Sequence, residues 1–338
     1  MRSNSLQYKE FAPQERRSAA TGEAAVQARD DVGPEHQREE LLTGLHAVEP
    51  SINSKFFYDS AGSELFARIC HLPEYYLTRT EAGILSDNSR TIAATLGTVG
   101  SVIEPGAGGC EKIRHLLKDL APGVYVPMDI SADYLERAAQ QLRAEFEALR
   151  VLPLTADFNR ELQLPGAALQ GRRLLFYPGS TIGNFTPEQA QWFLRRCAKM
   201  LGPGSGLLIG VDLHKDSAIL NAAYNDAQGV TAAFNRNILH HANRILDADF
   251  EPQNFEHLAF YNKPQHRVEM HLVSSVEQTV QYQGGALGFA AGDSIRTEYS
   301  CKYSREDFVH LAAVAGWRNL ACWTDSQEWF SVQYFEVE

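Results

Sequence analysis

The sequence predicts an α/β fold built on a parallel, doubly wound sheet. Two observations predict this sheet, and a third predicts what is added to it. Apolar runs alternate with amphipathic segments from Gly100 to Leu213, which is typical of strand–helix units that pair in parallel. A glycine-rich turn follows the first apolar run, and the alternation stops at about His214. The last observation predicts a second, mixed domain, inserted before the chain returns to the main sheet.

The elements can be assigned in order. ELLTGLHAV, from Glu39, predicts an amphipathic helix. Residues 51–79 are rich in aromatic side chains and predict a loop-rich segment, and residues 80–96 predict a helix. The alternating part then reads as GSVIEPGAGG (strand and turn), CEKIRHLLKDL (helix), YVPMDIS (strand), ADYLERAAQQLRAEFEAL (helix), VLPLTADF (strand), RRLLFYPGSTIGNF (strand), PEQAQWFLRRCAKML (helix) and GLLIGVDL (strand). Thr186 and Pro187 suit the cap and first position of the last helix.

The remaining third of the chain has a different pattern. Residues 220–224 and 231–243 predict helices, RVEMHLVSSVEQTVQY and SIRTEYSCKY predict strands, and the end reads as helix, strand and strand. We expect residues 1–38 to form a flexible tail, although a cloning or mis-started extension would look the same. Residues 39–79 and 214–302 are expected to form the second domain, and residues 80–213 and 303–338 the main domain.

Composition excludes several classes of protein. The 338 residues are 44% hydrophobic and 22% charged, with a net charge of −11. An acidic chain has no electrostatic attraction to nucleic acid or to an anionic membrane. No apolar run reaches the ~18 residues of a membrane span, and the polar start does not resemble a secretory signal. Five scattered cysteines without a CxxC pair indicate reduced thiols. We therefore expect a cytoplasmic protein.

The histidines do not predict a metal site. His240 and His241 are adjacent, so on a helix they point to different faces. His257, His266 and His271 lack HExxH or comparable spacing. Core or solvated histidines are the expectation.

The turn VIEPGAGG predicts a ligand site at the carboxyl edge of the sheet. Glycines such as Gly106 allow positive φ and close approach of the backbone to a ligand. The third glycine of a dinucleotide fingerprint is missing, so a cofactor without pyrophosphate is favoured. Glu104 would repel phosphate and could favour a sulfonium or an ammonium group.

The next two strand ends carry acids. Asp129 can accept hydrogen bonds from both hydroxyls of a ribose. Asp157 can accept from an adenine amino group while Phe158 packs on the ring. Together these positions predict an adenosine-containing cofactor. Lys112 is expected either to bind the cofactor's carboxylate or to pair with Glu111 or Asp119.

Several long segments resemble one family, the histidine-specific Nα-methyltransferases (hercynine synthases) of ergothioneine biosynthesis. They are FFYDSAGSELFARICHLPEYYLTRTEAGIL, PGSTIGNFTP, DLHKDSAILNAAYNDAQGVTAAFNRN, RVEM and IRTEYSCKY, and the resemblance covers about Phe56 to Asp325. The family's turn commonly reads ELGSGT where this chain has EPGAGG, and its DLVKD reads DLHKD here.

The resemblance implies a fold and an activity. The fold is a Rossmann-like S-adenosylmethionine-dependent methyltransferase domain with a second, substrate-binding domain formed by an N-terminal segment and a central insertion. The activity is three successive methylations of L-histidine, giving hercynine, with S-adenosylhomocysteine as the by-product. We expect a monomer that acts on a small molecule.

The resemblance also implies roles for individual residues. Tyr58 and Gly179 lie beside the reacting centre and the cofactor; Tyr75, Asn184 and Tyr224 bind the substrate, with Asn184 and Tyr224 on its amino-acid head group; Met270 is a wall of the imidazole pocket; Glu298 and Ser300 read the imidazole. Tyr58 and Asn184 are the expected catalytic residues.

The chemistry of these residues agrees with those roles. On a strand, Glu298 and Ser300 face the same way, so a carboxylate and a hydroxyl can address the two nitrogens of one ring. An ordinary amphipathic strand with its polar side in solvent would have the same pattern. The aromatic faces of Phe57, Tyr58 and Phe185 are candidates to stabilise the growing cation.

Three other functions remain open from the sequence. The same chemistry could act on another aromatic or imidazole amino acid. A non-catalytic, cofactor-binding partner of the pathway is the second, and a dinucleotide oxidoreductase is a more distant third.

Overall fold

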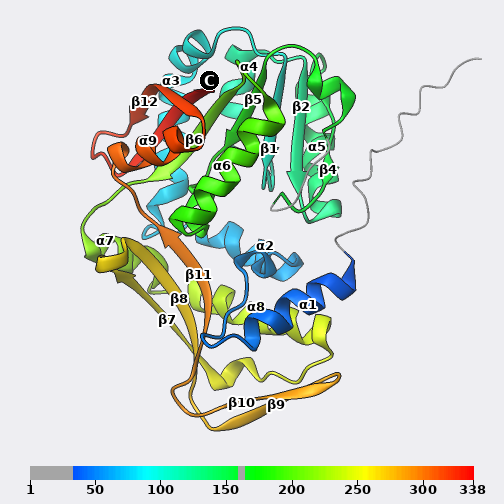
Figure 1. Cartoon of the computed structure of the whole chain (residues 1–338), viewed down its shortest axis with the longest axis vertical. Helices are drawn as coiled ribbons and strands as arrows, with labels where there is room; N and C mark the ends of the chain where they lie inside the picture. The colour runs from blue at the N-terminus through cyan, green and yellow to red at the C-terminus, as the bar shows by residue number, and fades with distance from the viewer. Residues whose placement is uncertain (1–32, 159–163) are drawn as a thin grey trace, which may run out of the picture.

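A computed structural model describes residues 33–158 and 164–338. Its largest sheet has the strand order β12-β13-β6-β5-β1-β2-β3, with β4 also paired to β2 (Figure 1). The strands are β1 (Ser101–Pro105), β2 (Val124–Asp129), β3 (Arg150–Val151), β4 (Leu154–Thr155), β5 (Arg173–Tyr177), β6 (Gly206–Asp212), β12 (Trp317–Thr324) and β13 (Phe330–Val337). β1 to β6 pair in parallel, and β13 is antiparallel to both β6 and β12. The predicted α/β class is confirmed.

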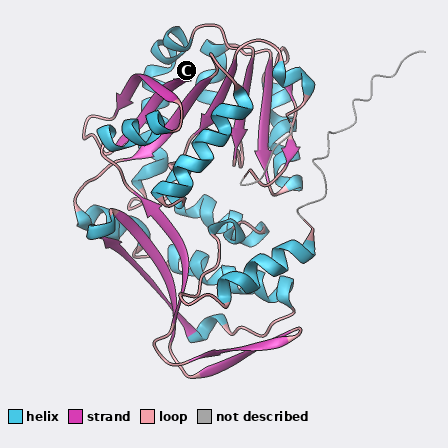
Figure 2. Ribbon diagram, in the orientation of Figure 1, coloured by secondary structure: helices cyan, strands magenta, loops and turns pink. Residues whose placement is uncertain are grey.

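Helices cover both faces of this sheet (Figure 2). α3 (Tyr76–Leu96), α4 (Arg114–Leu120) and α5 (Ala132–Glu145) lie on one face, and α6 (Pro187–Leu201) and α9 (Arg305–Val314) lie on the other. Neighbouring residues of a strand point to opposite faces, so Val102 of β1 packs with the first group and Ile103 with the second. Burial on both faces explains why these strands read as continuous apolar runs.

The order of the strands places a ligand crevice. From β1 the chain moves outward to β2, β3 and β4, and then returns to β5 on the other side of β1. Ligands of such sheets bind where the order reverses, at the carboxyl ends of the strands. The turns after β1 and β5, which hold Gly106 and Gly179, lie at this point.

A second group of elements lies beyond that edge of the sheet (Figure 1). It contains the antiparallel sheet β11-β8-β7 and the hairpin β9-β10. Its elements are α1 (Pro34–Leu45), α2 (Ser60–Ile69), α7 (Ser217–Tyr224), α8 (Val230–Leu246), β7 (Phe255–Asn262), β8 (Arg267–Ser274), β9 (Gln278–Tyr282), β10 (Gly285–Phe289) and β11 (Ser294–Cys301). The amide of Ile52 donates to Arg296 O (2.9 Å), which joins the N-terminal segment to β11. This arrangement supports the two-domain division, which we retain as a proposal.

Some element boundaries differ from the predictions. α1 begins at Pro34 rather than near Glu39, because proline suits the first helical turn; residues 1–32 lie outside the described residues. The segment expected to be loop-rich contains α2, which Asp59 caps by accepting a hydrogen bond from the amide of Gly62 (2.7 Å). The helix after the glycine turn begins at Arg114 rather than at Cys110.

Two strand assignments also change. The expected strand RVEMHLVSSVEQTVQY is two strands, β8 and β9, and β7 was not predicted. Among the described residues, no helix is long and apolar enough to cross a bilayer.

Candidate functional site

The glycine turn and the first acid are locked together at the carboxyl edge of the sheet. Gly106 and Gly108 have φ of +69° and +51°, values that favour glycine. The Gly108 amide donates to Asp129 Oδ2 (3.1 Å) and the Ser131 amide to Oδ1 (3.0 Å). A Cβ on Gly106 would lie 3.4 Å from the ring of Phe158. Three of the predicted cofactor residues therefore share one small region.

Asp157 is reached by a residue that the sequence did not single out. Lys55 Nζ lies 2.8 Å from Asp157 Oδ2 and 2.5 Å from Glu40 Oε2. Lys55 belongs to the N-terminal segment, and the buried side chain of Asp157 lies at the edge of the sheet, so this ion pair connects the two. An adenine amino group would have to share the carboxylate with Lys55.

Glu81 of α3 is a second residue that sequence reasoning missed. It is 1% exposed. Its carboxylate accepts from Lys112 Nζ (2.5 Å) and from the amide of Gly179 (2.9 Å to each oxygen). The ion-pair partner expected for Lys112 was therefore wrong: Glu81 takes the place of Glu111 or Asp119. Because Glu81 binds residues from the turns after β1 and β5, it fixes both sides of the crevice.

The electrostatic role expected for Glu104 depends on its protonation. Its carboxyl group is buried and accepts a hydrogen bond from the Tyr125 hydroxyl (2.6 Å). Burial raises the pKa of Glu104 to about 8. Protonation near neutral pH would reduce the negative charge that the sequence suggests for this position.

The rings of three tyrosines lie close together, near enough to Glu298 to be affected by its charge. The ring of Phe66 makes edge contacts with the rings of Tyr58 and Tyr75, with centroids 5.5 Å and 6.2 Å apart. The ring of Tyr75 makes an edge contact with that of Tyr224, with centroids 6.3 Å apart. Burial raises the pKa of all three phenols, and the charge of Glu298 raises it further. Each phenol is therefore neutral and offers one donor and an acceptor.

The strand β11 brings the expected imidazole readers together. Glu298 pairs with Met270 of β8 and Ser300 with Val268, and a β-bulge separates Arg296 from Glu298. Directly opposed residues share a face of the sheet, so Met270 and Glu298 are neighbours. Glu298 is half-buried, and burial, opposed by the charge of Lys302, raises its pKa to about 7. The Tyr224 hydroxyl donates to Ser300 Oγ (2.8 Å).

Asn184 ends the short helix η3 (Thr181–Asn184), which packs against β11. A Cβ on Gly183 would lie 2.8 Å from Cys301 O, so this close approach requires glycine. The short helix η3 thus places Asn184 beside the strand that carries Glu298 and Ser300.

A buried ionic network lies beneath these residues. Asp212, at the end of β6, is 2.6 Å from Lys215 Nζ and 2.8 Å from Lys302 Nζ. The Tyr76 hydroxyl donates to the same carboxylate (2.7 and 2.8 Å). Lys302 also donates to Ser300 Oγ (2.7 Å) and Tyr224 Oη (3.3 Å). The DLHKD and TEYSCKY segments contain the network, but its contacts were not predicted.

The aromatic residues proposed for a cation are not equivalent. Phe57 is fully buried and stacked on Phe234 at 4.4 Å, and Phe185 is stacked on Phe193 at 5.4 Å. One face of each ring is therefore occupied. Tyr58 is half-buried and makes only edge contacts with Phe66 and Phe234, so it is the best placed of the three.

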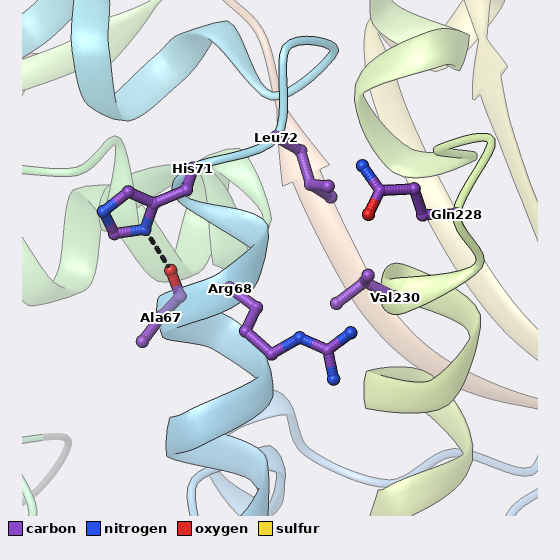
Figure 3. Close-up of a pocket in the computed structure, with 6 residues that line it drawn as sticks. All are labelled: Ala67, Arg68, His71, Leu72, Gln228 and Val230. Atoms are coloured by element: carbon purple, nitrogen blue, oxygen red, sulfur yellow. Dashed lines mark hydrogen bonds between the residues drawn. The ribbon is translucent and has the colours of Figure 1, made fainter.

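A separate surface pocket of about 400 Å³ lies between α2 and the start of α8 (Figure 3). It is lined by Ala67, Arg68, His71, Leu72, Gln228 and Val230. None of the predicted site residues lines it. In the described parts of the chain, no group of three His, Cys, Asp or Glu side chains could hold a metal ion.

Comparison with known proteins identifies the family. Residues 37–337 match the model of the histidine-specific, S-adenosylmethionine-dependent methyltransferases. The chain belongs to this family. The predicted family and cofactor are confirmed.

Three relatives illustrate the match. The chain is 42% identical to the histidine N-alpha-methyltransferase of Mycolicibacterium smegmatis over 87% of its length and 93% of the relative's. It is 39% identical to the Mycobacterium tuberculosis protein of the same name, over 88% and 93%. It is 30% identical to ergothioneine biosynthesis protein 1 of Neurospora crassa, over 80% of this chain and 32% of that protein.

The residues at the crevice fit S-adenosylmethionine. A Cβ on Gly108 would meet no atom within 4 Å, so this part of the turn has open space beside it. Asp129 accepts one backbone hydrogen bond on each oxygen, and each oxygen keeps a lone pair for a ribose hydroxyl. Gly106, Asp129 and Phe158 would hold the nucleoside, and Lys112, next to Gly179, would face the amino-acid end.

Proposed function

We propose that this protein transfers methyl groups from S-adenosylmethionine to the α-amino group of L-histidine, three times in succession, giving hercynine for ergothioneine biosynthesis. The observation that carries the proposal is the cluster of Tyr58, Tyr75, Tyr224, Glu298 and Ser300. It combines a ring-reading carboxylate and hydroxyl with neutral phenols at the edge of the cofactor crevice.

The protein mainly orients the substrate. S-adenosylmethionine supplies an activated methyl group when bound. Glu298 accepts a hydrogen bond from the imidazole N–H, and Met270 packs against the ring. Tyr75, Asn184 and Tyr224 hold the amino-acid head group without adding a buried charge, which would be costly if unpaired. Such positioning can account for much of a rate enhancement.

The proton chemistry is modest. The α-amine must be neutral to attack, and its reference pKa near ~8 leaves a neutral fraction at mildly alkaline pH. Because burial raises the pKa of Tyr58, its phenol stays protonated and is not a phenolate base. Its hydroxyl can accept a hydrogen bond from the amine and help to align it, and its ring can lie against the methylated cation. Each of the first two transfers leaves an ammonium group, which loses a proton to water before the next transfer.

We also propose that the protein acts as a cytoplasmic monomer on a small-molecule substrate. Its net charge of −11 supports a soluble protein without affinity for nucleic acid or anionic membranes.

The test is mass spectrometry of histidine incubated with the protein and S-adenosylmethionine. We expect products with one, two and three added methyl groups, all on the α-nitrogen by fragmentation. Tryptophan, tyrosine and phenylalanine serve as competing substrates. Turnover of one of these in place of histidine would refute the proposed substrate, and the absence of any methylated amino acid would refute the activity.

A further inference from the structure

Lys302 is a buried ammonium that faces two of the substrate-binding hydroxyls. Its side chain is 0% exposed. Three oxygens surround its Nζ atom: Asp212 Oδ2 (2.8 Å), Ser300 Oγ (2.7 Å) and Tyr224 Oη (3.3 Å). An ammonium group has three donors and no acceptor. All three donors therefore have partners inside the protein, and none is left for a substrate.

The positions of the hydroxyl protons follow from this arrangement. Tyr224 and Ser300 both accept from Lys302, so neither can donate to it. Their oxygens are 2.8 Å apart, and one hydroxyl proton lies between them. The phenol is the stronger acid and hence the better donor, so Tyr224 donates to Ser300. Ser300 Oγ then accepts two hydrogen bonds, which uses both of its lone pairs.

We propose that Lys302 is a positioning residue that fixes the Ser300 hydroxyl as a donor, so that the pocket selects a ring with an unprotonated nitrogen. This inference rests on the proposed function and deepens it. Glu298 lies two residues away on the same strand and supplies the acceptor. The strand therefore offers one donor and one acceptor, in a fixed order.

Of the two common side chains with a nitrogen in the aromatic ring, histidine and tryptophan, only histidine matches this pair through its ring nitrogens. A neutral imidazole has one N–H and one bare ring nitrogen. An indole has an N–H and no bare nitrogen, and a benzene ring has neither. A donor that cannot rotate into an acceptor is left unpaired by tryptophan or phenylalanine, and unpaired buried polar groups discriminate strongly between substrates. Lys302 thus contributes to the choice of histidine without touching it.

Asp212 makes this arrangement possible. It balances the charge of Lys302 and is itself held by Lys215 and by the Tyr76 hydroxyl. Lys215 contacts the other oxygen of the same carboxylate and the carbonyl of Leu213, and it makes no hydrogen bond to Ser300 or Tyr224. Lys215 is therefore a matched control for the loss of one lysine from Asp212.

The test is a double-mutant cycle with Lys302→Met and Ser300→Ala, read out as KM and kcat for histidine. Lys302→Met is expected to raise the KM about tenfold, equivalent to ~1.4 kcal/mol, with a smaller effect on kcat. In the Ser300→Ala background the same change is expected to raise the KM less than twofold, because Lys302 acts through Ser300. Lys215→Met is expected to change the KM less than twofold.

Folding is checked by the melting temperature and by the affinity for S-adenosylhomocysteine. If Lys302→Met does not fold, Lys302→Gln replaces it, with the same direction of change and the same dependence on Ser300. Independent effects of the Lys302 and Ser300 substitutions, or an equal effect of Lys215→Met, would overturn the inference. Failure of the wild-type protein to methylate histidine would instead refute the proposed function.

Discussion

Replacing Asp212 by asparagine removes the anion that two buried lysines share. The side chains of Asp212 and Lys302 are 0% exposed and that of Lys215 is 3% exposed. Removing one partner of a buried ion pair typically destabilises a protein by about 3–5 kcal/mol, because a charge is left without compensation. We expect Asp212→Asn to lower the free energy of unfolding by that amount at pH 7.

The loss should shrink as the pH rises. Burial, opposed by the Asp212 charge, lowers the pKa of Lys215 from 10.5 to about 8. Between these two values the unfolded chain binds more protons than the folded one, so stability rises with pH. Without Asp212 the pKa of Lys215 in the folded state falls further. The pH range in which stability rises with pH therefore begins at a lower pH. The difference between variant and wild type should therefore be about 1 kcal/mol smaller at pH 9 than at pH 7.

The assay is urea denaturation at both pH values. Asp216→Asn is the control, because Asp216 is a nearby residue whose role is to cap α7 by accepting from the amide of Ala218 (2.7 Å). Asparagine caps a helix about as well as aspartate, so the control should lose less than about 0.5 kcal/mol. A loss for Asp212→Asn no larger than that of the control, or one that grows with pH, would refute this account of the network.

Three further predictions concern the site itself. The KM for histidine should be measured for Glu298→Gln and for the wild type, and the ratio of variant to wild type should rise as the pH passes through about 7, where Glu298 ionises. Titration of the substrate affects both proteins equally and cancels in this ratio. A ratio that does not change with pH would contradict the role of the carboxylate. Glu81→Gln should weaken S-adenosylhomocysteine binding about tenfold (~1.4 kcal/mol) in calorimetry, because the amide offers Lys112 and Gly179 one acceptor oxygen instead of two and no negative charge; unchanged affinity would contradict it. Asp129→Ala should weaken the same binding by at least about tenfold, and it should also lower the melting temperature of the free protein, because the amides of Gly108 and Ser131 lose their acceptor; equal affinity would remove Asp129 from the nucleoside site.

Patterns within the sequence predicted the parts of the fold that depend on local order. The alternating strands and helices were readable because burial on both faces makes each strand a continuous apolar run, and Thr186 with Pro187 marked the start of α6. α2 was missed although its sequence carries a helix signal, with Asp59 as the cap and Leu65, Phe66 and Ile69 at helical spacing, because the aromatic density of the surrounding segment was given more weight. The pairing of β7 with β8 depends on partners along the sheet, which a single strand does not reveal.

The site residues divide in the same way, into those that local sequence order marks and those that contacts between distant residues determine. Strand ends predicted Asp129 and the glycine turn, and the alternation along β11 predicted that Glu298 and Ser300 share a face. Lys55, Glu81 and Lys302 were not predicted, because each binds a partner distant in the chain. Only the folded chain brings Lys55 to Asp157 or Lys302 to Asp212. The shifted pKa of Glu104 could not be predicted from the sequence either, because it results from burial in the folded protein.

A crystal structure with both S-adenosylhomocysteine and histidine would test the central claim most directly. The account predicts the imidazole between Glu298 and Ser300, with its N–H toward the carboxylate and its bare nitrogen toward the hydroxyl. The α-amine should point to the sulfur atom above the turn at Gly106. A histidine bound with its ring away from β11, or an α-amine turned away from the sulfur, would contradict it.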